Sequence, residues 1–91
     1  MSDDPVLGES RARISELDRT ILEAANARLE LVARLWRYKE ENGLPLVDPA
    51  REAELVAELV AANPGPLSAE GVEELFRAIV DLVKREAARR D

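Results

Sequence analysis

The segment from about residue 9 to residue 42 contains no proline and no glycine, and it is rich in alanine, leucine, arginine and glutamate. These residues favour helix, so the segment predicts one helix of about 50 Å at 1.5 Å per residue. A compact domain of 91 residues has a diameter of only about 30 Å. The helix therefore overhangs its own domain, and we expect a second copy of the chain to cover its far half.

Two further helices are predicted from their start signals. In "VDPARE", Asp48 can accept hydrogen bonds from free backbone N–H groups, and Pro49 suits the first helical position. Ser68 is a good N-cap for the third helix, and Gly43 with Pro45 ends the first. Because no strand signal occurs, the sequence predicts an all-α fold. We expect three helices per chain with a very long first helix, assembled as an intertwined helical homodimer.

Composition limits the chemistry and the partners of this chain. It has neither Cys nor His, which excludes a disulfide and a cysteine nucleophile and removes the commonest general base and metal ligand. A formal charge of -6 disfavours nucleic acid as a partner. No apolar run is long enough to span a membrane, and the first ten residues lack a signal core. We expect a cytoplasmic protein with a flexible N-terminus at 1–9 and one all-α domain at 10–91.

Two cations interrupt the apolar stripe of the long helix. Arg28 and Lys39 are eleven residues apart, which places them about 20° apart around the helix. One interpretation is that their heads reach water or pair with an acid such as Asp18 or Glu52. The other is an anion site between helices. The stripe that they interrupt consists of Ile14, Leu17, Ile21, Ala24, Ala25, Val32 and Leu35.

A third basic residue, Arg11, lies at the edge of the apolar arc and about 25 Å along the helix from Arg28. It cannot easily serve the same pocket in the same chain. In an antiparallel dimer it could serve the pocket of the partner.

The segments "RARISELDRTIL", "ARLELV", "YKEENGLPLVDPARE" and "ELFRAIV" resemble the all-α bacterial chorismate mutases, from about Ser10 to Ala87. The resemblance implies an intertwined dimer that converts chorismate to prephenate in aromatic amino acid biosynthesis, with no cofactor and no metal. It also implies a pocket shared between the two chains. The residues that appear at the spacing of the family are Arg11, Arg28, Lys39, Asp48, Arg51 and Glu52.

The resemblance also implies roles for these residues. Arg28 and the partner's Arg11 would grip the two carboxylates of chorismate, with Arg51 supporting that side. Lys39 would donate to the ether oxygen. Glu52 and the backbone near Asp48 would hold the ring hydroxyl. Simpler interpretations stay open: Asp48 is a helix cap, Glu52 favours a helix N-terminus, and Arg51 and Arg11 can be surface residues.

The third helix departs from the family pattern. Val83 and Ala87 stand where the family has a Ser and a Gln, and Ala87 cannot donate a hydrogen bond. Glu86 is adjacent but about 100° away around the helix, and it would have to be protonated to donate. We therefore expect low activity, and we expect a glutamine at position 87 to raise it. Trp36 and Tyr38 replace smaller residues and are interpreted as filling the core or the dimer interface, or as reshaping the pocket.

Other functions compete with the mutase interpretation. An isochorismate-pyruvate lyase has a similar fold and cationic pocket. A non-catalytic member could bind a chorismate-like metabolite, or regulate a shikimate-pathway enzyme such as DAHP synthase. The loop "NPGP" resembles the loop of mutase domains fused to that synthase. A purely structural helical dimer would not explain why Arg11, Arg28, Lys39 and Glu52 occur together.

Overall fold

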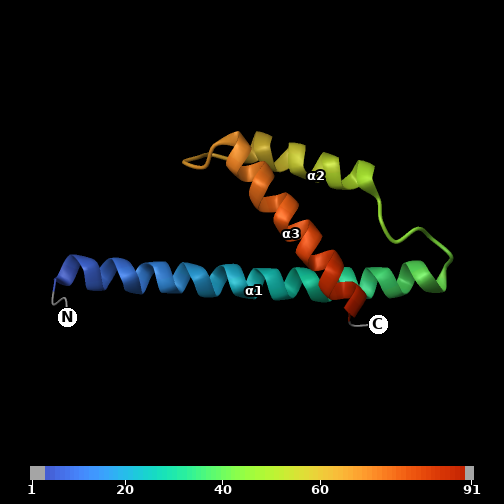
Figure 1. The fold of residues 1–91 in the computed structure, drawn as a ribbon, viewed down its shortest axis with the longest axis horizontal. Helices are drawn as coiled ribbons and strands as arrows, with labels where there is room; N and C mark the ends of the chain where they lie inside the picture. The colour runs from blue at the N-terminus through green and yellow to red at the C-terminus, as the bar shows by residue number, and fades with distance from the viewer. Residues whose placement is uncertain (1–3, 90–91) are drawn as a thin grey trace.

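The computed structural model describes residues 4–89, which form three α-helices and no strand. Helix α1 (Pro5–Glu41) is a long rod, and α2 (Pro49–Ala62) lies on one side of it. Helix α3 (Ala69–Arg89) runs diagonally from the end of α2 to the C-terminal half of α1 (Figure 1). It packs on both, whereas the backbones of α1 and α2 stay apart within the described residues. The all-α prediction is confirmed.

Helix α1 begins earlier than the sequence analysis placed it. The side chain of Asp4 accepts a hydrogen bond from the Val6 backbone N–H at 2.8 Å, and Pro5 occupies the first helical position. This cap extends the helix through residues 5–9, which were expected to be flexible. Residues 1–3 of that segment lie outside the described residues.

The end of α1 is a Schellman motif that turns the chain back toward α2. The Leu44 N–H donates to the Lys39 carbonyl oxygen at 2.8 Å, and the Gly43 N–H donates to that of Glu40 at 3.3 Å. Gly43 has a φ of 65°, a conformation that glycine adopts at little cost. The predicted stop at Gly43 is confirmed, and it sets the direction of the connector to α2.

The predicted caps of α2 and α3 are also confirmed. Asp48 accepts from the Arg51 N–H at 3.1 Å, and the Ser68 hydroxyl oxygen accepts from the Gly71 N–H at 3.0 Å. These short-range bonds satisfy backbone donors that a helix cannot pair internally.

The core of the single chain is small, and much apolar surface lies outside it. A compact monomer of this mass would expose about 5,300 Å², whereas this chain exposes 7278 Å². Its radius of gyration is 17.2 Å, against about 12 Å for a compact domain of this length. The buried side chains are Trp36, Val56, Val72, Val80, Val83 and Ala87.

The apolar stripe in the N-terminal half of α1 contributes to this excess surface. Ile14, Leu17 and Ile21 are exposed by 57%, 62% and 62%. None of the three described helices is both long and apolar enough to cross a membrane.

Candidate active site

Lys39 is half-buried near the C-terminal end of α1, and its Nζ donates to the Leu46 carbonyl oxygen at 3.2 Å. The connector that follows folds beside it, so that Lys39 and Asp48 border the same cavity, of about 370 Å³. The other residues that line this cavity are apolar: Leu44, Pro45, Val47 and Pro49. Two of the predicted site residues therefore come together where α1 ends and α2 begins.

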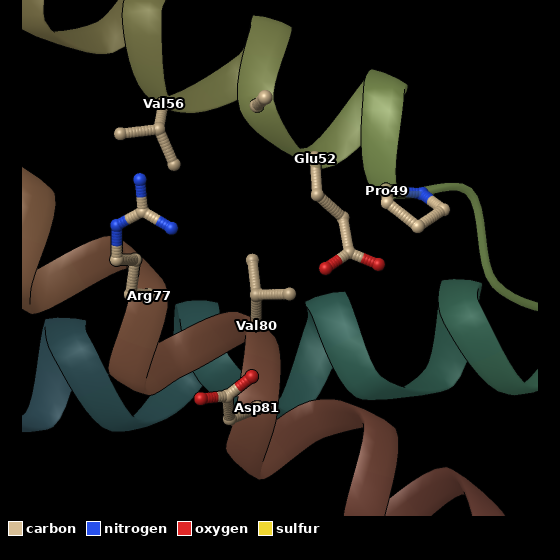
Figure 2. Close-up of a pocket in the computed structure, with 7 residues that line it drawn as sticks. Pro49, Glu52, Val56, Arg77, Val80 and Asp81 are labelled. Atoms are coloured by element: carbon tan, nitrogen blue, oxygen red, sulfur yellow. The ribbon is translucent and has the colours of Figure 1, made fainter.

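Glu52 lies one turn into α2 and is half-buried. Its carboxylate points from α2 into a second cavity, with Arg77, Val80 and Asp81 across from it on α3 (Figure 2). The volume of this cavity is about 220 Å³. Pro49 lines both cavities, so both lie beside the first turn of α2.

The two arginines of α1 are in different surroundings. Arg28 is half-buried in the C-terminal half of α1, whereas Arg11 is exposed near the N-terminal end. Both lie on one continuous helix, so their backbones are about 25 Å apart. A single chain does not bring Arg11 to the other predicted site residues.

Arg51 extends along the exposed side of α2. Its guanidinium lies 3.3 Å from Glu54 and 3.5 Å from Glu58. The hydrogen bond to Glu54 raises the pKa of Arg51 above its usual value, and the charge of Glu58 adds to the increase. In the single chain its partners are therefore acids of its own helix.

The third-helix positions that depart from the family pattern face the core. Val83 and Ala87 are exposed by only 3% and 1%, and neither lines either cavity. Glu86 is half-buried and pairs with Arg89 at 2.8 Å. These three residues supply no hydrogen-bond donor to the space around Lys39 and Glu52 in this chain.

The sequence analysis missed Lys84. Its Nζ lies 3.0 Å from Glu52 Oε1 and 3.9 Å from Asp81 Oδ1, so it links α3 to α2. Around the helix Lys84 lies about 40° from Val80 on the side away from Ala87, just outside the apolar arc and between Glu73 and Arg77. A lysine in such a polar stretch of a helix is ordinary, so the local sequence pattern gave no signal for it.

The two large aromatic residues of α1 differ in burial. Trp36 is only 9% exposed, whereas Tyr38 is 58% exposed. The interpretation of Trp36 as a core residue is thus confirmed. Among residues 4–89, no three His, Cys, Asp or Glu side chains are grouped so that they could hold a metal ion.

Residues 10–87 match the family model of chorismate mutase type II. The chain belongs to this family. The match spans all three helices, including the Lys39 connector and the Lys84 turn of α3. The resemblance inferred from the residues is thereby confirmed.

Solved structures agree with membership of the chorismate mutase type II family. A chorismate mutase from Thermus thermophilus (form II) is 35% identical, with a TM-score of 0.88 over 93% of this chain and 97% of that one. Form I from the same organism is 36% identical, with a TM-score of 0.83 over 85% of this chain and 96% of the other.

Two relatives extend the comparison to longer proteins. The T-protein of Haemophilus influenzae is 36% identical over 78 residues, which are 85% of this chain and 21% of that protein. The 4-amino-4-deoxychorismate mutase of Streptomyces venezuelae is 35% identical over 51 residues, or 56% of this chain and 50% of that protein. The chain thus spans about a fifth of the length of the T-protein and about half of the length of the 4-amino-4-deoxychorismate mutase.

Proposed function

We propose that this protein catalyses the rearrangement of chorismate to prephenate. The observation that carries the proposal is that Lys39 and Asp48 border one cavity and Glu52 another, both beside Pro49, in a chain of the chorismate mutase type II family. A cation and an acid near one another suit a substrate that has carboxylates, an ether oxygen and a ring hydroxyl.

The reaction is intramolecular and needs no nucleophile, so the protein has two tasks. It holds the compact conformer in which the reacting carbons meet, and it stabilises negative charge on the ether oxygen as the C–O bond breaks. Lys39 Nζ would donate to that oxygen through one N–H group, while another keeps its bond to the Leu46 carbonyl oxygen. Arg28 would bind one carboxylate through its guanidinium fork, and Glu52 would accept from the ring hydroxyl.

The second carboxylate requires a further cation, and the spacing of the family gives this role to Arg11, which a single chain does not bring to this place. We infer that the partner's Arg11 supplies it in an antiparallel homodimer. The excess exposed surface and the uncovered stripe of Ile14, Leu17 and Ile21 support this assembly. Burying apolar area of this kind contributes about 25 cal/mol per Å². A single chain leaves this area exposed, so it can contribute only in an assembly.

We expect turnover to be slow. Val83 and Ala87 are buried and apolar, so α3 supplies no donor from these positions to share the ether oxygen with Lys39. Losing one such donor typically costs a factor of about 10²–10³ in rate. The same observation favours the second candidate function, a member that binds a chorismate-like ligand without efficient turnover and acts with a partner enzyme.

Incubation of the purified protein with chorismate, with identification of the product, tests the proposal. Prephenate formation above the uncatalysed rate is the expected result. Binding of chorismate without turnover would support the ligand-binding function instead. Release of pyruvate from isochorismate, with no loss of chorismate, would identify a lyase.

A further inference from the structure

The Glu52 carboxylate is already held by a second charged side chain. Lys84 Nζ donates to Glu52 Oε1 at 3.0 Å, and both side chains are 30% exposed. The contact joins residues 32 positions apart on two helices, so it reflects how α2 and α3 pack. Partial burial strengthens an ion pair over one that is fully in water.

The geometry leaves Glu52 with one engaged and one available oxygen. Lys84 donates to Oε1, and a carboxylate can accept several hydrogen bonds. Oε2 can therefore accept a hydrogen bond from a ligand. The lysine also holds the carboxylate at a defined place and cancels its charge, which makes Lys84 a positioning residue for Glu52.

Two other charged side chains, Asp81 and Arg77, lie near the pair of Lys84 and Glu52. Asp81 Oδ1 lies 3.9 Å from the same Nζ, and Arg77 lines the cavity across from Glu52 (Figure 2). Lys84 thus stands between two carboxylates. Without it, Glu52 and Asp81 would present negative charge to a ligand, and Arg77 would be the cation that lines the same cavity.

We propose that Lys84 makes this site select a ring hydroxyl over a charged amino group at the position that Glu52 contacts; the inference rests on the proposed function. A hydroxyl donates to Glu52 without adding charge. An aliphatic amine is protonated near neutral pH, and its ammonium group would sit beside the Lys84 ammonium, where like charges repel.

A purely structural ion pair would behave differently. If the pair only tied α2 to α3, its removal would weaken folding and would affect both kinds of substrate alike. Selectivity between two ligands that differ in one group separates these roles.

The test measures kcat/KM for chorismate and for 4-amino-4-deoxychorismate in wild type, Lys84→Met, Lys84→Arg and Arg85→Met. We expect Lys84→Met to lower the ratio of kcat/KM for chorismate to kcat/KM for 4-amino-4-deoxychorismate by about tenfold. Lys84→Arg keeps the cation and should keep the ratio. Arg85→Met removes one charge from an exposed neighbour on α3 and should leave the ratio unchanged. An unaltered ratio in a folded Lys84→Met protein would overturn the inference.

A second variant and a binding measurement keep the inference testable if Lys84→Met does not fold or if wild type is inactive. If Lys84→Met does not fold, Lys84→Gln retains hydrogen-bond donors without the charge, and the same drop in ratio is expected. If wild type does not turn over chorismate, the proposed function is wrong, and the ratio of the two affinities from calorimetry replaces the kinetic ratio. Equal affinity ratios in wild type and Lys84→Met, or no binding of either compound to wild type, would overturn the inference.

Discussion

Lys39 on α1 and Leu46 in the connector are joined by a hydrogen bond of 3.2 Å from Nζ to the backbone carbonyl oxygen. The cation that we assign to the ether oxygen is thus held in place by the segment that leads to α2. An ammonium has three N–H donors, so Nζ can donate to the substrate while the Leu46 carbonyl oxygen continues to orient it.

Replacing Lys39 with Met should lower kcat by about 10²–10³, because a donor to developing charge is lost. The free energy of unfolding should fall by only about 1 kcal/mol, since one partly buried hydrogen bond is lost. Steady-state kinetics and urea unfolding measure the two effects. Arg37→Met, an exposed cation on the same helix, is the control, and a Lys39→Met enzyme with normal kcat would refute the assignment.

Asp48 has a cap role that can be separated from any role in binding. Asp48→Ala removes the bond to the Arg51 N–H and should cost about 1 kcal/mol of stability. Asp48→Asn retains a side-chain acceptor and should retain both stability and kcat/KM, because the backbone near residue 48 is expected to contact the substrate. If the Asn variant is stable but loses activity, the carboxylate itself is needed.

Trp36 should be a main determinant of stability. It is 9% exposed, and truncation of a buried Trp typically costs about 3–5 kcal/mol. Unfolding of Trp36→Ala followed by far-UV circular dichroism measures this loss. Tyr38→Ala, at a 58% exposed position of the same helix, should cost much less. Equal losses in the two variants would mean that the burial of Trp36 is unimportant.

Ala87→Gln should destabilise the protein rather than accelerate it. The sequence alone predicts a faster enzyme, but Ala87 is 1% exposed, and a larger side chain there would overpack the core at a cost of about 1–3 kcal/mol. Ala88→Gln, at an exposed neighbouring position, is the control. A faster Ala87→Gln enzyme with unchanged stability would place residue 87 at the substrate.

The dimer can be tested at the exposed stripe of α1. Ile21→Glu should yield a monomer by light scattering at micromolar concentration, because it buries a charge in the proposed interface. Arg19→Glu lies on the opposite side of the helix and should leave the dimer intact. A wild-type protein that is monomeric at this concentration would contradict the assembly and the role of Arg11.

Most helix boundaries follow from capping residues, prolines and glycines that are close to them in the sequence. Asp48 with Pro49, Ser68, and Gly43 each act on backbone groups within a few residues, so tertiary structure is not needed to read them. The same Asp–Pro pattern at residues 4 and 5 starts α1, and the sequence analysis overlooked it. The candidate site residues on α1 and α2 were predicted from their spacing along the helices and from the resemblance to a family.

The amino-acid sequence by itself determined three helices, their ends, the family and the cations on the apolar arc of α1. Tertiary structure decided how α3 is rotated about its axis. An apolar arc is wide enough to allow more than one rotation, and only packing against α1 and α2 selects one. That rotation buries Val83 and Ala87 and brings Lys84 to Glu52, a contact between distant residues that no local pattern specifies.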